Sequence, residues 1–260
     1  MPQFTDQTGR SVTIDSDPKR IISLVPSQTE LLHYFGLDEE VIGITKFCVH
    51  PNEWFRTKTR VGGTKQLNID LIRSLQPDLI IGNKEENVKE QINLLEKEFP
   101  VWLSDVNSLD DAIWMIKETG KITGCENKAN ELSDAILVAF KKIIPPSTRK
   151  KCIYLIWDKP MMVAGSKTFI DSMITVAGLD NAMGHKSRYP EITRDDIIKI
   201  HPDLIILSSE PYPFTKHQQE TFSLEFPFAK VELADGEMFS WYGSRMLNAA
   251  RYFQDIARQW

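Results

Sequence analysis

The feature that most constrains the fold of this chain is an internal repeat. The segment Asn68–Ile81 has a counterpart 125 residues later, Thr193–Ile206, with the same spacing from an acidic residue to a Pro-Asp pair. Each copy has the pattern of a short amphipathic helix, a Pro-Asp turn and a buried Leu-Ile-Ile strand. A helix–turn–strand unit repeated at this distance predicts two lobes of one topology.

Two shorter matches occur in the same order as the main repeat. The tripeptide Glu-Phe-Pro at 98–100 returns at 225–227, each time before an apolar strand, and Gly-Leu-Asp at 36–38 returns at 178–180, each time after a helix. The alternative is that Pro-Asp-Leu-Ile is simply a common way into a strand in any α/β protein. Three matches in one order favour the duplication.

Apolar runs of strand length alternate with helical segments in both halves, which predicts an α/β fold with mainly parallel sheets covered on both faces. The runs are Arg20–Val25, Val41–Ile44, Leu79–Ile81, Val101–Leu103, Cys152–Ile156, Leu204–Leu207 and Val231–Leu233. After the first run, Ser27–Glu30 has the pattern of a capping box that begins a helix, and Gly36 is expected to end that helix.

Between the two halves, residues 121–146 have apolar positions at helical spacing, and two prolines at 145 and 146 stop the pattern. We therefore expect an N-terminal lobe over 1–120, one long connecting helix over 121–146 and a C-terminal lobe over 147–260, with a ligand cleft between the lobes. A single stiff connector predicts that ligand binding closes the lobes by only a few degrees.

Composition excludes some classes of function. The net charge is −5 and the charged residues are interspersed, so a nucleic-acid partner is not expected. No apolar run reaches the roughly 20 residues that span a bilayer, and Met1–Arg10 lacks the features of a secretory signal. The protein is thus expected in the periplasm or at the cell surface if an export signal was removed, and in the cytoplasm if this N-terminus is native.

No catalytic motif is present. The sequence has no Gly-rich phosphate loop, no Gly-x-Ser-x-Gly and no Cys-x-x-Cys, and its three cysteines are too far apart to imply a disulfide framework. His50 with Cys48 is a poor acid–base set for a metal chelatase, because no second His or clustered carboxylate lies in the same loops. We expect a protein that is not an enzyme, and keep a cytoplasmic metal-chelate-binding or chelatase-like protein as the alternative.

Three stretches of the sequence carry a family resemblance. Arg20–Leu32, the paired Pro-Asp-Leu-Ile strands and Asp235–Arg245 resemble the class III solute-binding proteins of ABC importers, over nearly the whole chain. That group handles cobalamin, iron–siderophores and haem, and the vitamin B12-binding branch is the most similar. The resemblance implies a monomer that delivers a bound chelate to a permease dimer in the membrane. It implies a corrinoid ligand first, an iron–siderophore or haem next, and no intrinsic cofactor.

The loops that follow the predicted strands are rich in aromatic residues. Ligands of open α/β sheets bind beyond the carboxyl ends of the strands, and a flat macrocycle needs aromatic and Met faces with donors such as Arg at its polar rim. Met162, like Met161, would serve equally well in the core. The candidate ligand-binding residues are Pro26, Phe47, His50, Trp157, Met162, Arg188, Tyr189, Trp241, Tyr242 and Arg245.

The resemblance adds detail to this set. It implies that six of the candidates lie on or beside cleft-lining positions, namely Pro26, Phe47, His50, Met162, Tyr189 and Trp241. Two cleft tryptophans of vitamin B12-binding relatives align near Thr64 and Asn83. Because Trp241 and Tyr242 are adjacent, they are not both expected to point inward, and we expect one of them in the cleft.

Three polar residues have two interpretations each. His50 is a candidate axial ligand of cobalt or iron, since a neutral imidazole binds both, although most loop histidines are only hydrogen-bonded. Asp70 and Asp195 begin equivalent helices, where the helix dipole alone favours an acid. The resemblance implies a second role for these two acids, pairing with arginines of the permease.

Overall fold

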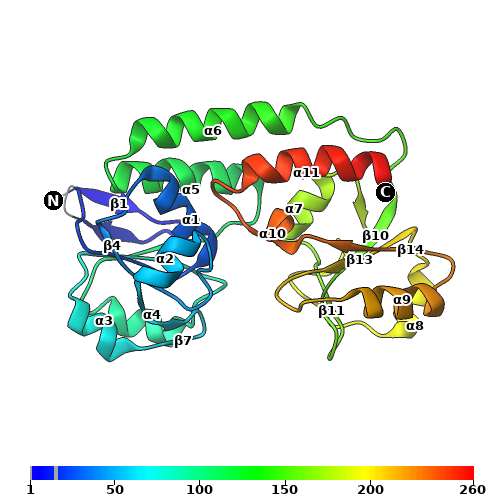
Figure 1. The fold of residues 1–260 in the computed structure, drawn as a ribbon, viewed down its shortest axis with the longest axis horizontal. Helices are drawn as coiled ribbons and strands as arrows, with labels where there is room; N and C mark the ends of the chain where they lie inside the picture. Colours follow the sequence, from blue (N-terminus) through cyan, green and yellow to red (C-terminus); the bar gives the residue numbers. More distant parts are fainter. Residues whose placement is uncertain (1, 15–16) are drawn as a thin grey trace. The chain divides into compact units, whose positions relative to one another are not determined.

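The computed structural model describes residues 2–14 and 17–260. Contacts within the chain divide it into two compact units (Figure 1). Unit 1 comprises Met1–Val106, Asp110–Ala135 and Tyr242–Arg245. Unit 2 comprises Asn107–Leu109, Ile136–Trp241 and Met246–Trp260.

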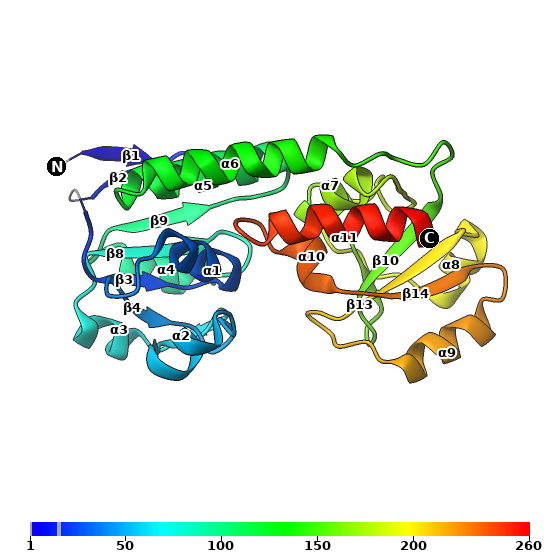
Figure 2. The same cartoon turned by 45° about the horizontal axis from the view of Figure 1, so that its top comes forward.

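Unit 1 is built on a five-stranded sheet in the order β5-β4-β3-β8-β9, in which all neighbouring strands are parallel; Figure 2 shows β4, β3, β8 and β9 side by side. Two antiparallel pairs, β1–β2 and β6–β7, accompany it. The strands are β1 Gln3–Thr5, β2 Ser11–Thr13, β3 Ile21–Ser23, β4 Val41–Ile44, β5 Thr59–Arg60, β6 Gly62–Gly63, β7 Gln66–Leu67, β8 Leu79–Asn83 and β9 Val101–Ser104. The helices are α1 Pro26–Phe35, α2 Asn52–Thr57, α3 Ile69–Leu75, α4 Lys89–Leu95 and α5 Leu109–Ile122.

Unit 2 has a second sheet in the order β11-β10-β13-β14, with β12 also paired to β10. Only β11 runs antiparallel to its neighbour. The strands are β10 Lys151–Trp157, β11 Met162–Val163, β12 Asp180–Asn181, β13 Leu204–Ser208 and β14 Lys230–Ala234. The helices are α7 Phe169–Val176, α8 Arg194–Ile200, α9 Lys216–Glu225, α10 Gly236–Ser240 and α11 Met246–Gln259.

The central strands of both sheets are buried along their whole length, as β8 and β13 are at every position. Helices cover both faces of such sheets, so their strands lack the polar alternation of half-exposed strands. The predicted α/β class with mainly parallel sheets is therefore confirmed.

The repeated Pro-Asp pair has the same structural task in both units. In unit 1 the Asp78 carboxylate accepts the backbone N–H groups of Lys19 and Arg20 at 2.7 and 2.9 Å, just before β3. In unit 2 the Asp203 carboxylate accepts the N–H of Lys151, the first residue of β10, at 2.8 Å. Each aspartate thus fixes the start of the neighbouring strand to the end of the repeated helix.

The repeated Glu-Phe-Pro tripeptide also has a shared role. Glu98 pairs with Arg73 of α3 at 2.7 Å, and Glu225 pairs with Arg194 of α8 at 2.5 Å. Both ion pairs join the repeated helix to the segment that leads into the last strand of the sheet. The Pro-Asp and Glu-Phe-Pro matches therefore have corresponding structural roles in the two units.

The expected connecting helix is shorter than its sequence pattern. Residues 121 and 122 belong to α5, and a turn with Gly124 at φ +68° separates α5 from α6, which spans Glu126–Lys141. Figure 1 shows α5 and α6 side by side. The helix α6 belongs to unit 1 as far as Ala135 and to unit 2 from Ile136 onward. The prediction of one helix over 121–146 was wrong at both ends.

The predicted capping box at Ser27–Glu30 was also wrong. Helix α1 begins at Pro26, and the preceding Val25 makes no side-chain cap. Proline at the first helical position needs no N–H partner and has the right φ, so Ser27 lies inside the helix. The predicted end of this helix is confirmed, since Gly36 adopts φ +80°.

Candidate functional site

The carboxyl ends of the parallel strands in unit 1 lead into Pro26, Thr45, Lys84 and Asp105. Pro26 is half-buried at the start of α1. After β4, the ring of Phe47 is 50% exposed and the Lys46 Nζ lies 5.2 Å from its centroid. His50 is half-buried in the same loop. This edge of unit 1 therefore presents an aromatic face that the rest of the unit does not cover.

Cys48 stands beside these residues but faces inward. Its Sγ lies 3.1 Å from the Thr29 hydroxyl and 3.2 Å from that of Thr45, and the residue is fully buried. Burial raises the pKa of the Cys48 thiol. A neutral buried thiol is a structural group rather than a nucleophile or metal ligand.

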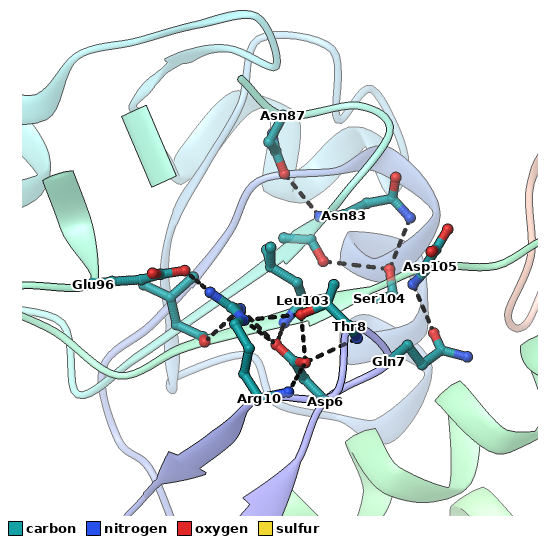
Figure 3. Close-up of polar contacts among 12 residues, drawn as sticks. Asp6, Gln7, Thr8, Arg10, Asn83, Asn87, Glu96, Leu103, Ser104 and Asp105 are labelled. Atoms are coloured by element: carbon teal, nitrogen blue, oxygen red, sulfur yellow. Dashed lines mark hydrogen bonds and ion pairs between the residues drawn. The ribbon is translucent and has the colours of Figure 1, made fainter. Parts of the chain in front are cut away.

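A buried network of neutral polar side chains lies at the ends of β8 and β9 (Figure 3). The Ser104 hydroxyl accepts hydrogen bonds from the side-chain amides of Asn83 and Gln28, at 2.9 and 2.6 Å. The Asn87 Oδ1 accepts the backbone N–H of Asn83 at 2.8 Å. Asn83 is buried, and its hydrogen bonds join the end of β8 to Ser104 and Asn87.

In unit 2, the loop after β10 carries Trp157 and the two methionines. Trp157 is 39% exposed, and its Nε1 donates to the Lys159 carbonyl at 3.1 Å. Met162 is half-buried, whereas Met161 is only 6% exposed and belongs to the core. The two adjacent methionines therefore differ in burial, and only Met162 is accessible at the start of β11.

Arg188 and Tyr189 lie in another loop of unit 2, between β12 and α8. The Arg188 Nη1 donates to the Asn107 Oδ1 at 3.1 Å and to the Lys167 carbonyl at 2.8 Å. Its guanidinium carbon lies 5.8 Å from the centroid of the Tyr189 ring. The guanidinium is therefore bonded to protein groups within unit 2.

Trp241 and Tyr242 are both buried, at 6% and 5% exposure. The expectation that adjacent aromatics cannot both point inward was wrong, because the chain passes from unit 2 to unit 1 between them. Trp241 bonds within unit 2. Tyr242 is packed in unit 1, where burial raises the pKa of its phenol well above the ordinary value.

Arg245 is engaged by a carboxylate of unit 1. Its Nε and Nη2 donate to the two oxygens of Glu30 on α1, at 2.8 and 2.6 Å. The two side chains are only 11% and 21% exposed. Such a bidentate, partly buried pair is geometrically specific, and it joins the segment Tyr242–Arg245 to α1.

Glu210 is a residue that the sequence reasoning missed. It follows β13, and its Oε1 accepts the Trp241 Nε1–H at 2.9 Å and the Ser240 hydroxyl. It also lines a cavity of about 510 Å³ in unit 2, whose walls are Ser209, Glu210, Phe214, Leu233, Ala234, Asp235 and Glu237. The only signal in the sequence was its place directly after a predicted strand.

The matched acids Asp70 and Asp195 are both exposed. Neither is the cap of its helix: Asn68 caps α3, and Thr193 with Asp196 forms a capping box on α8. Asp70 is 93% exposed and lies 3.2 Å from the Arg73 Nη1. Their carboxylates therefore remain at the surface of the two repeated helices.

Across residues 2–14 and 17–260, no group of three or more His, Cys, Asp or Glu side chains could hold a metal ion. In the same part of the chain, no helix is long and apolar enough to cross a membrane.

Two proteins of similar sequence are named as binding proteins. The chain is 27% identical over 213 residues to an uncharacterised ABC transporter substrate-binding lipoprotein of Bacillus subtilis, covering 77% of this chain and 67% of that protein. It is 26% identical over 212 residues to a cobalamin-binding protein of Halobacterium salinarum, covering 77% of this chain and 57% of that longer protein.

Solved structures share the fold. A periplasmic haem-binding protein of Vibrio cholerae superimposes with a TM-score of 0.77 at 19% identity, over 91% of this chain and 98% of that one. The sequence pattern of one family matches residues 21–228, most of the chain. This chain belongs to the periplasmic binding protein family.

Proposed function

We propose that this protein is the solute-binding component of an ABC importer and that it carries a corrinoid. Its action is binding and release, with no bond made or broken in the ligand. The membership of the periplasmic binding protein family and the two relatives, one a transporter component and one a cobalamin-binding protein, support this proposal. An iron–siderophore and haem are the next candidates, and a cytoplasmic chelate-binding or chelatase-like protein is the alternative.

The observation that favours a corrinoid is that both candidate arginines, Arg188 and Arg245, already have partners within the protein. Arg188 is bonded to Asn107 and Lys167, and Arg245 is bonded to Glu30. Haem has carboxylate arms, which require cationic partners, whereas the arms of a corrinoid are neutral amides. Of the lysines at these strand ends, Lys84 pairs with Asp105 and Lys46 lies over the Phe47 ring. Loops with neutral polar groups, aromatic faces and cations that already have partners are better matched to amides.

The ligand is proposed to contact the exposed or half-buried members of the candidate set, with the buried members as their support. Phe47 and Trp157 expose the largest aromatic faces of the set, and Pro26, His50, Met162 and Tyr189 are half-buried. Trp241, Tyr242, Arg188 and Arg245 are held by the protein itself.

Delivery is proposed to use Asp70 and Asp195, whose carboxylates would pair with arginines of a permease dimer. Because both are exposed on equivalent helices, a monomer offers two similar acidic contacts to a partner made of two subunits. The protein would then work outside the cytoplasmic membrane.

The test is a titration of the purified protein with cyanocobalamin, haemin and a ferric hydroxamate, followed by tryptophan fluorescence. We expect quenching by cyanocobalamin at the lowest concentration. Tighter binding of haemin or of the hydroxamate would reassign the ligand, and no binding of any of the three would remove the transport proposal. In the same experiment, His50→Ala should shift the visible spectrum of the bound cobalamin if His50 is an axial ligand, and an unchanged spectrum excludes that role.

A further inference from the structure

The hydrogen bonds to the Glu210 side chain, just after β13, involve only one of its two carboxylate oxygens. Both hydrogen bonds that reach its side chain, from Trp241 Nε1 and from the Ser240 hydroxyl, go to Oε1. In the part of the chain that the structure describes, no hydrogen bond or ion pair reaches Oε2. One oxygen is therefore occupied by the protein, and the residue that carries the other lines the cavity.

The backbone around Glu210 is fixed as well. The Ser208 hydroxyl donates to the Glu210 carbonyl at 2.6 Å and accepts from the Tyr154 hydroxyl at 3.0 Å. Gly236 opens α10 so close by that a Cβ there would lie 2.6 Å from the Glu210 Cγ. The loop and the start of α10 thus leave the Glu210 side chain little freedom, and the indole of Trp241 is fixed with it.

The charge of Glu210 is not balanced within its surroundings. No cation pairs with it among the described residues, and the two other ionisable groups that line the cavity, Asp235 and Glu237, are acids. Burial is the main cause that raises the pKa of Glu210, and the charges of Glu237 and Asp235 add to it. A glutamine could accept the same hydrogen bond from the indole without the cost of burying a charge. The presence of a carboxylate instead indicates a role beyond holding the indole.

We propose that Glu210 sets ligand specificity: its Oε1 positions the Trp241 indole, and its Oε2 accepts a hydrogen bond from a donor arm of the ligand that enters the cavity. The site then favours amide-bearing arms and repels carboxylate-bearing ones. At about 510 Å³, the cavity has room for an arm of a macrocycle. This inference rests on the proposed function, because it assumes a chelate with polar arms.

The experiment compares two corrins that share a ring and differ in their arms. Cobinamide has amide arms, and cobyrinic acid has carboxylic acid arms. We expect the unchanged protein to bind cobinamide at least about tenfold more tightly. Glu210→Gln keeps an oxygen acceptor for Trp241 but removes the charge, so the ratio of the two affinities should fall about fivefold or more. Glu220→Gln, on the exposed side of α9 in the same unit, is the matched control and should leave the ratio unchanged.

A separate measurement tests whether Glu210 positions the Trp241 indole. In protein labelled with 5-fluorotryptophan, the Trp241 resonance is assigned through Trp241→Phe. It should stay near its position in Glu210→Gln and shift or broaden in Glu210→Leu, which has no acceptor. An unchanged affinity ratio in Glu210→Gln with binding intact overturns the specificity role. An unmoved Trp241 resonance in Glu210→Leu overturns the positioning role. Failure of both corrins to bind the unchanged protein overturns the proposed function instead.

Discussion

Asp6 is a carboxylate without exposed side-chain surface. Its Oδ2 accepts hydrogen bonds from the Arg10 Nε and Nη2 at 2.9 and 2.5 Å, and its Oδ1 accepts the backbone N–H of Thr8 at 2.9 Å (Figure 3). Burial on its own would raise the pKa of Asp6, but the bonds and charge of Arg10 outweigh burial, so the pKa lies below its ordinary value. Arg10 also pairs with Glu96, which ties the β1–β2 hairpin to the end of α4.

We expect Asp6→Asn to lower the free energy of unfolding at neutral pH by about 2 kcal/mol, because charge-assisted bonds to a buried group are lost. Since the folded-state pKa of Asp6 is depressed, this contribution is present above the unfolded pKa and disappears as the pH falls through the folded one. Urea unfolding at neutral and at acid pH measures the difference. Asp255→Asn, exposed on α11, is the control, and an equal loss at both pH values would contradict the account.

At the residue scale, the sequence indicated candidate side chains but not the side chains that bind them. Glu30 and Arg245 are separated by 215 positions, and Glu210 and Trp241 by 31. Patterns of periodicity and capping describe neighbours within a few residues, so neither pair was predictable. Trp241 and Arg245 were singled out as ligand-binding residues, whereas the two glutamates that fix them were not.

Helices α1 and α7 end in the same way, as the repeated Gly-Leu-Asp indicated. Gly36 at φ +80° and Gly178 at φ +82° both adopt the left-handed conformation. The N–H of each following leucine bonds to the carbonyl five residues before it, Leu37 to Leu32 at 3.2 Å and Leu179 to Ile174 at 3.1 Å. This pattern is a Schellman motif, in which glycine has no Cβ to strain.

The two glycines differ in their surroundings, which makes them a matched pair. A Cβ on Gly36 would meet only the Nζ at the end of the Lys128 side chain, at 3.1 Å, whereas a Cβ on Gly178 would lie 2.4 Å from the Pro146 Cδ. We expect Gly36→Ala to destabilise by about 1 kcal/mol, the cost of the backbone alone. Gly178→Ala should destabilise by about 3 kcal/mol because it adds overpacking. Denaturant unfolding of both variants measures this, and equal losses would show that the proline yields without cost.

At the scale of the elements, strands were predicted more accurately than helix ends. All seven predicted apolar runs overlap a strand, because a parallel strand covered on both faces is mostly apolar along its length. The long-helix prediction failed at Gly124, where apolar spacing continues through a left-handed turn. The capping box at Ser27 failed because Pro26 began the helix one residue earlier.

For the whole molecule, the duplication places one acid at the same point of each unit. We expect the double variant Asp70→Lys with Asp195→Lys to lose transport in reconstituted vesicles by at least about tenfold, since two charge pairs with the permease become repulsive. Its affinity for the ligand should stay unchanged. The control is Asp134→Lys with Asp255→Lys, which alters the net charge equally at two exposed helix positions. Full transport by the first double variant would rule out docking through these acids.

Unit 1 is not made from one continuous stretch of chain. Glu30 is synthesised early, and Arg245, which completes its ion pair, is translated 215 residues later. Domains near the start of many proteins fold while the ribosome is still adding residues. Unit 1 cannot be completed until Tyr242–Arg245 has been made, which is after nearly all of unit 2. Being first in the chain therefore does not let unit 1 be the first of the two to be complete.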